Sequence, residues 1–256
     1  MQDPLNDKTI EKNRYDGVSR TLLEHFEVTS LEFGYSFLPL YLQPPYEAYY
    51  SNLCHYINRG ARVLELGSGS GQHTEVLVDT DAKVLASDIS SVSLQLLKKR
   101  FKVMRDKEIE TRELDIERLP FDDNSFEVVV SAGSLSYGDN TIVMDQIFRV
   151  LKCGGHFICV DSLGNNPIYR LNRFLHFLRG KRSKNTLTNM PTLNTLSSYR
   201  ERFSHVDVQF FGSCAWTGAI LAKFFNEGIA HRLVSSIDEK FNFTSSAFKF
   251  VMVCRK

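Results

Sequence analysis

The sequence lacks a net charge of either sign and lacks any apolar run long enough to cross a membrane. Its 256 residues hold 31 Lys and Arg against 30 Asp and Glu, a formal net charge of +1. This balance gives the chain as a whole no attraction to nucleic acid or to a charged membrane. A spanning helix needs about 20 consecutive apolar residues. The polar start MQDPLNDKTIEKNR does not resemble a secretory signal, so we expect a cytoplasmic protein without a transmembrane segment.

Paired cysteines and metal-ligand spacings are also absent. The five cysteines form no Cys-x-x-Cys pair, and no Cys/His cluster has the spacing of a zinc site. We therefore expect reduced cysteines and no bound metal.

The middle of the chain does have a regular alternation of strand-like and helix-like segments. Strands are expected at 61–66, 82–88, 109–115, 125–133 and 156–161, and the first is a short apolar run typical of a buried parallel strand. The last helix between them is expected to stop at Gly154 and Gly155. The tail adds strands at 205–212 and 246–256, one of them antiparallel at the edge, and a helix around 214–230. The pattern predicts a Rossmann-like, doubly wound, mostly parallel seven-stranded sheet with helices on both faces and an insertion after strand five.

Three glycines in alternate positions follow the first strand, in the stretch VLELGSGSGQHT at 63–74. Glycine at a strand-to-helix turn lets a ligand approach the main chain, and the helix beyond it offers free N–H groups. The dinucleotide fingerprint Gly-x-Gly-x-x-Gly is not met. Its last glycine would fall at position 72 or at position 74, which are occupied by Gln72 and Thr74. Glu65, just before the turn, would repel a pyrophosphate. The stretch therefore favours a cationic ligand.

This glycine run resembles motif I of the class I S-adenosylmethionine (SAM)-dependent methyltransferases, in the form acid-x-Gly-x-Gly-x-Gly. Four further landmarks follow in the family's order: ASDIS, LDIERLPFDDNSFEVVV, SAGSLSYGDN and IFRVLKCGGHFICV. Together they resemble the methyltransferase type 11-like members over residues 61–161. The resemblance fades on both sides, where the family places its substrate-specific parts.

The resemblance implies SAM as cofactor and S-adenosylhomocysteine as product. Asp88 would accept hydrogen bonds from the ribose, and Asp115 from the adenine amino group, although either could instead cap the turn that follows it. Glu65 would orient the cationic methionine end. The implied cofactor residues are Tyr15, Glu65, Gly67, Ser68, Gly69, Gly71, Asp88, Ile89, Asp115, Ile116, Ala132 and Gly133.

The same comparison divides a single methyltransferase domain, residues 1–256, into four parts. Residues 1–60 are expected to form an N-terminal helical lid and 61–161 the SAM-binding core. Residues 162–203 would cover the substrate, and 204–256 would supply the C-terminal strands and a helix.

No residue stands out as the general base that a hydroxyl acceptor would need. The candidates are His73 in the motif I helix, His176 in the insertion and Tyr137 in the loop after strand four. A structural or solvated role is the alternative for each histidine. Tyr137 could instead contact SAM or the acceptor.

Acidic residues are missing from 162–200, which carries seven basic ones: Arg170, Arg173, Arg179, Lys181, Arg182, Lys184 and Arg200. A helix is expected here with one apolar face, formed by Ile168, Leu171, Leu175 and Leu178. Three interpretations stay open. The helix could be an amphipathic cover with a solvated basic face, or it could rest on an anionic membrane surface. Alternatively, Arg170 and Arg173 could bind an anionic acceptor, because guanidinium forks suit phosphate and carboxylate.

The sequence thus predicts a SAM-dependent methyltransferase for a small, anionic acceptor of sugar, nucleotide-sugar or natural-product type, with oxygen favoured over nitrogen as the accepting atom. A non-catalytic SAM-binding protein on the same fold is the alternative. An NAD-dependent oxidoreductase is disfavoured by the glycine spacing. We expect no nucleic-acid partner, because the basic stretch is short and no RNA-binding module is evident.

Overall fold

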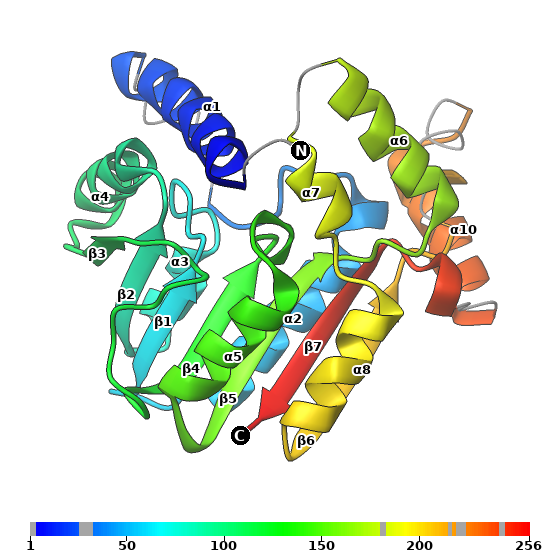
Figure 1. Ribbon diagram of the computed structural model, residues 1–256. Helices are drawn as coiled ribbons and strands as arrows, with labels where there is room; N and C mark the ends of the chain where they lie inside the picture. Colours follow the sequence, from blue (N-terminus) through cyan, green and yellow to red (C-terminus); the bar gives the residue numbers. More distant parts are fainter. Residues whose placement is uncertain (1–3, 26–32, 180–182, 215–216, 219–223, 241–243) are drawn as a thin grey trace.

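A seven-stranded sheet forms the centre of the computed structural model, which describes residues 4–25, 33–179, 183–214, 217–218, 224–240 and 244–256 (Figure 1). The strands lie in the order β3-β2-β1-β4-β5-β7-β6. Their bounds are β1 Arg62–Leu66, β2 Lys83–Asp88, β3 Glu110–Glu113, β4 Phe126–Ala132, β5 Leu151–Ser162, β6 His205–Phe211 and β7 Lys249–Arg255. The prediction of a mostly parallel sheet of seven strands is confirmed.

The antiparallel strand is β7. It was expected at the edge of the sheet but lies inside it. It pairs with β5 on one side and with β6 on the other, so β6 forms the edge. The physical reason is burial: six of the seven residues of β7 are buried, whereas β6 alternates between exposed and half-buried positions. A strand covered on both faces belongs inside a sheet.

Helices cover both faces of the sheet (Figure 1). On one face lie α2 (Pro44–Tyr56), α3 (Thr74–Asp79) and α4 (Ser91–Arg105). On the other lie α5 (Asn140–Val150) and α8 (Leu193–Arg202). This double cover explains why the central strands are continuous apolar runs and do not alternate with polar residues.

The prediction that Gly154 and Gly155 stop a helix is wrong. Helix α5 ends at Val150, and β5 begins at the next residue. The pairing of β4 with β5 shifts register in this region. A Cβ on Gly155 would lie 2.7 Å from the carbonyl oxygen of Glu127. The glycines therefore allow an irregular start to β5 where two main chains approach closely.

The regions outside the core add further helices. The N-terminal part has α1 (Pro4–Glu24), the short turn η2 (Leu40–Leu42) and α2. The insertion has α6 (Pro167–Leu178) and α7 (Asn185–Thr188) before α8. The helix expected at 214–230 includes residues 215–216 and 219–223, which lie outside the described part, and α10 (Glu227–Lys240) comes later than expected. The remaining turns are η3 (Leu135–Tyr137) and η4 (Thr244–Ser246).

All five cysteines are free thiols. Within the described ranges, every helix is too short or too polar to cross a bilayer.

Candidate functional site

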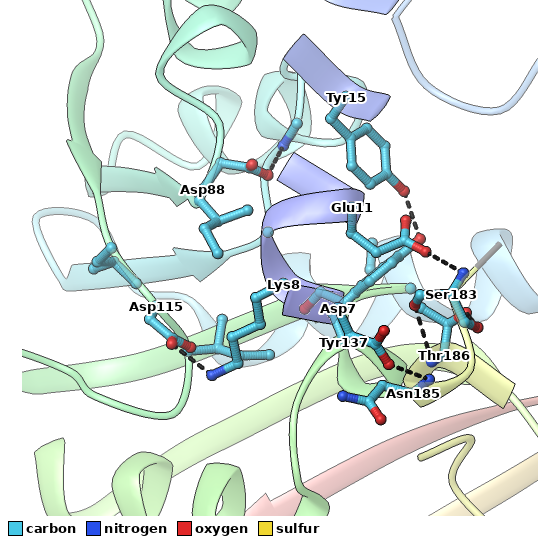
Figure 2. Close-up of a pocket in the computed structure, with 18 residues that line it drawn as sticks. Asp7, Lys8, Glu11, Tyr15, Asp88, Asp115, Tyr137, Ser183, Asn185 and Thr186 are labelled. Atoms are coloured by element: carbon cyan, nitrogen blue, oxygen red, sulfur yellow. Dashed lines mark hydrogen bonds and ion pairs between the residues drawn. The ribbon is translucent and has the colours of Figure 1, made fainter. Parts of the chain in front are cut away.

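A cavity opens at the carboxyl ends of β1, β2 and β4, beside helix α1 (Figure 2). This is where doubly wound sheets bind their ligands. Nine of the expected cofactor residues line it: Tyr15, Gly67, Gly69, Asp88, Ile89, Asp115, Ile116, Ala132 and Gly133. The other lining residues are Asp7, Lys8, Glu11, Leu114, Ser134, Tyr137, Ser183, Asn185 and Thr186.

The glycines of the motif have different purposes. Gly67 has φ +67° and lies against the loop after β4, since a Cβ there would be 2.4 Å from the Cβ of Ser134. A Cβ on Gly69 or Gly133 would have no atom within 4 Å. Their main chain is therefore bare where it lines the cavity. Gly71 does not line the cavity and packs on a leucine of α4.

Asp88, the last residue of β2, organises the glycine loop. Its carboxylate accepts hydrogen bonds from the N–H of Gly69 at 2.9 Å and from the N–H of Ser90 at 2.8 Å. Burial raises the pKa of Asp88 above its ordinary value, and these two hydrogen bonds oppose the rise. Asp88 thus supports the turn into α4, and it also lines the cavity.

Helix α1 is bonded to the core side of the cavity. The Nζ of Lys8 lies 2.6 Å from Oδ2 of Asp115 and forms a second ion pair with Glu117. Asp115 also accepts a hydrogen bond from the N–H of Glu117 at 3.0 Å, as expected of a turn cap. Lys8 thus contacts the carboxylate that the resemblance assigns to adenine.

The same helix is bonded to the insertion on the other side. Glu11 accepts a hydrogen bond from the N–H of Ser183 at 2.9 Å, and Asp7 accepts one from the N–H of Asn185 at 3.1 Å. Figure 2 shows these bonds joining the helix to the segment that carries α7. Helix α1 therefore connects the two walls of the cavity.

Sequence reasoning missed the residues that α1 contributes besides Tyr15. A signal was present, because Asp7, Glu11 and Tyr15 follow one another at four-residue spacing and so share a helix face. No comparable signal marked Ser183 or Asn185. They reach the cavity only because the insertion folds back over the sheet.

Residues 64–159 match the sequence family described as "Methyltransferase domain", from within β1 to within β5. The core of this chain is a class I methyltransferase domain. The cofactor of this domain class is SAM.

Curated methyltransferases are similar to somewhat less than half of this chain. "Demethylmenaquinone methyltransferase" of Lactococcus lactis subsp. lactis (strain IL1403) is 35% identical over 123 residues, which cover 46% of this chain and 49% of that protein. The protein of the same description from Clavibacter sepedonicus is 34% identical over 117 residues, covering 43% and 45%. The chain thus spans about half the length of the curated relatives it matches.

Solved structures share the fold at low identity. Haemonchus contortus phosphoethanolamine N-methyltransferase 2 superposes with a TM-score of 0.58 at 17% identity, over 82% of this chain and 52% of that chain. Geranyl diphosphate C-methyltransferase of Streptomyces coelicolor A3(2) superposes with a TM-score of 0.57 at 14% identity, over 82% and 77%. At these identities the likeness concerns the fold alone.

Two of the three candidate bases, Tyr137 and His176, differ in their position relative to the cavity. Tyr137 lines the cavity, and its hydroxyl forms a hydrogen bond with the hydroxyl of Tyr15. His176, on α6, is not one of the described residues that line the cavity.

His73 lies behind the glycine loop and outside the cavity lining. Its Nδ1 is 2.8 Å from the hydroxyl of Tyr50, and its ring stacks on Tyr46 with 5.2 Å between centres. Burial and the nearby charge of Lys249 lower the pKa of His73 to about 4. It is therefore neutral at pH 7 and a weak base.

A buried group of charges lies beside the cavity, where β5 ends and β7 begins. Asp161 is 1% exposed and Lys249 is 9% exposed. The carboxylate of Asp161 accepts a hydrogen bond at 2.9 Å from the N–H of Leu135, in the loop that also carries Ser134 and Tyr137. Burial raises the pKa of Asp161, and the charge of Lys249 opposes that rise. The group is thus connected to the cavity through one loop.

Rings and an arginine complete this group. The Nζ of Lys249 lies 5.1 Å from the ring centre of Tyr46. The Nε of Arg173 is buried and has no hydrogen-bond partner in the part of the chain that the structure describes. The charge of Arg173 also acts to lower the pKa of Asp161. Arg170, the other arginine expected to bind the acceptor, is exposed to solvent. We call Tyr46, His73, Asp161, Arg173 and Lys249 the cationic cluster.

Glu65 and Ser68 support the glycine loop from behind and do not line the cavity. Glu65 is 3% exposed and accepts a hydrogen bond from the hydroxyl of Thr74 at 2.7 Å. Burial, with a contribution from the charge of Asp88, raises the pKa of Glu65 to about 7. The Oγ of Ser68 is buried and lacks a hydrogen-bond partner within the described chain.

Glu65 should make the stability of the protein fall with rising pH when no cofactor is added. Its folded-state pKa, about 7, is raised from 4.5. The stabilisation is thus fully present below the unfolded pKa and is lost as pH rises through the folded pKa. Glu65→Gln removes this titration and keeps an acceptor for Thr74. The difference in free energy of unfolding between variant and wild type should shift in favour of the variant by on the order of 3 kcal/mol as the pH rises from about 5 to 8. Urea unfolding at both values tests this, and a constant difference would contradict it.

Proposed function

We propose that this chain transfers a methyl group from SAM to an oxygen of an acidic, natural-product-type acceptor. The observation that carries the proposal is the cavity itself, which combines bare main chain at Gly69 and Gly133 with the Asp88 carboxylate at the end of β2. We further propose that residues 1–256 act as a single cytoplasmic domain with the four parts described above.

The residues present fit the cofactor. Asp88 would accept hydrogen bonds from the ribose hydroxyls, and the side chains of Ile89 and Ile116 would contact the adenine ring. Asp115 would accept from the adenine amino group beside Lys8. The bare main chain at Gly69 and Gly133 would face the methionine end. When bound, SAM supplies a methyl group on a positively charged sulfur.

Glu65 and Ser68 would act on the cofactor through the loop. A buried carboxylate with a pKa near neutrality is stabilised in its charged form by a nearby cation. The hydroxyl of Ser68 is buried and lacks a hydrogen-bond partner within the described chain. The Glu65 carboxylate favours a ligand with a cationic end, which supports SAM in preference to NAD.

We propose that the cationic cluster binds the acidic group of the acceptor. Lys249 and Arg173 are two positive charges whose effect reaches one buried carboxylate, Asp161. The negative charge of an acceptor would balance the remaining positive charge of the cluster. Burial would strengthen the attraction between the acceptor and the two cations. An acidic hydroxyl held there would be ionised before transfer, so the weakly basic His73 is not needed as a general base. Arg173 keeps the role expected from the sequence, while Lys249 replaces the exposed Arg170.

The relatives support the natural-product end of the expected acceptor range. Their names refer to demethylmenaquinone and, for a Mycobacterium tuberculosis protein 33% identical over 112 residues, to phthiotriol and phenolphthiotriol dimycocerosates. We therefore propose a phenol, an enol or a carboxylic acid as the accepting group in preference to a sugar hydroxyl.

Calorimetric titration with SAM and with NAD tests the cofactor. We expect saturable binding of SAM only, and folded protein that fails to bind SAM would overturn the proposal. Release of S-adenosylhomocysteine in the presence of a panel of phenolic and carboxylic acceptors separates an enzyme from a non-catalytic SAM-binding protein.

Removing either cation of the cluster should weaken acceptor use alone. Lys249→Met and Arg173→Met are each expected to raise the acceptor KM about tenfold, because each removes one charge-assisted contact. The Kd for SAM should stay unchanged. Lys98→Met, an exposed position on α4, is the matched control. An acceptor KM that moves equally in all three variants would exclude the cluster from acceptor binding.

A further inference from the structure

Helix α6 presents its apolar side chains to solvent. Ile168, Leu171, Phe174, Leu175 and Leu178 are between 42% and 63% exposed, and we call these five the outer stripe. The helix has no buried residue at all. A cover helix would place this face against the protein, so that interpretation of the sequence is wrong for α6.

The outer stripe points directly away from the protein. At about 100° per residue its five members occupy an arc of about 120°. The less exposed residues Tyr169, Arg173, His176 and Phe177 occupy the opposite arc. Tyr169 fixes this orientation, because its hydroxyl donates to the Oγ of Ser162 at 3.0 Å and its ring lies 4.9 Å from that of Phe248.

Positive charge borders the stripe on both sides. Arg170 lies next to one edge of the arc and Arg179 next to the other, and both are exposed. The surrounding segment, 162–200, contains no Asp or Glu. Two of its basic residues, Lys181 and Arg182, lie outside the described chain. An apolar stripe between basic residues is the pattern of a helix that lies in the interface of an anionic bilayer.

We propose that the outer stripe of α6 docks on a membrane surface rich in anionic lipids. Its apolar side chains enter the headgroup region, and Arg170 and Arg179 contact lipid phosphates. The consequence for the site is positional. Helix α6 contacts α7, whose residues Asn185 and Thr186 line the cavity, and both helices lie on the side of the carboxyl ends in Figure 1. Docking would therefore place the cavity next to the bilayer.

Co-sedimentation of the full chain with lipid vesicles tests this inference. We expect binding to vesicles of phosphatidylglycerol and phosphatidylcholine, much weaker binding to phosphatidylcholine alone, and release by salt. The double variant Leu171→Glu, Leu178→Glu should lose about tenfold or more in apparent vesicle affinity, because it places charge in the apolar stripe. Arg170→Gln with Arg179→Gln should lose severalfold and show less dependence on salt.

Val103→Glu on α4 is the matched control. Val103 is 51% exposed but belongs to a different surface, so this variant should bind vesicles like the wild type. Three results would overturn the inference: no binding of wild type to anionic vesicles, an equal loss in the control, or a stripe variant that dissociates a dimer in gel filtration and binds vesicles normally. The assay needs neither SAM nor methyl transfer, so its failure leaves the proposed function standing.

Discussion

Replacing Gly67 with alanine is expected to produce the largest loss of any single change at the site. The residue has φ +67°, and its added Cβ would meet the Cβ of Ser134 at 2.4 Å. The left-handed conformation costs a residue with a side chain about 1–2 kcal/mol, and overpacking adds about 1–3 kcal/mol. We expect the free energy of unfolding to fall by about 2–5 kcal/mol and SAM binding to drop below detection. Urea unfolding and calorimetric titration measure the two effects.

Gly60→Ala is the matched control for that experiment. Gly60 has φ +76° and no atom within 4 Å of a built Cβ, and it precedes β1 at the end of the strand opposite the cavity. It should lose only the conformational part, about 1–2 kcal/mol, and should bind SAM normally. If Gly67→Ala bound SAM as well as Gly60→Ala does, the glycine loop would not be the cofactor cradle.

Replacing Asp88 with alanine should weaken SAM binding by about 1–3 kcal/mol, or roughly five- to 150-fold in Kd. The variant removes an ionised acceptor from the proposed ribose position. It also leaves the N–H groups of Gly69 and Ser90 without their partner, which loosens the loop. Asp88→Asn keeps one acceptor oxygen and should lose less. Calorimetric titration with SAM gives the affinities of the wild type and of the two Asp88 variants.

Asp122→Ala is the control here, because Asp122 is an exposed acid far from the cavity in the loop before β4. Equal affinity of Asp88→Ala and Asp122→Ala for SAM would place the ribose somewhere other than the end of β2.

Much of the core was predictable because its signals are local. A buried parallel strand needs an unbroken apolar run, so β1, β2 and β4 are visible in the sequence to within a residue or two at each end. The glycine loop is visible because ligand access requires glycine whatever surrounds it. The two errors in the sheet, at β7 and at the start of β5, concern pairing between distant segments, which leaves no local pattern.

Site residues could be predicted from the sequence only where they lie at the ends of the core strands. Residues at strand ends, such as Asp88 and Gly133, could be assigned because parallel strands bring their carboxyl ends together. Lys249 could not. It lies near Asp161 only because β7 inserts between β5 and β6, although the two residues are about 90 positions apart in the sequence. A lone lysine at the start of a strand carries no sign of such a neighbour.

The sequence by itself determined the βαβ core, the glycine loop at its switch point and the amphipathic character of the insertion helix. Each of these follows from side-chain periodicity or from a residue's own conformational range. Only the tertiary structure decided that α1 is bonded to both walls of the cavity, that Lys249 and Arg173 lie near one buried carboxylate and that the apolar stripe of α6 faces outward. The physical reason is that periodicity defines a face but not its partner, which long-range packing selects.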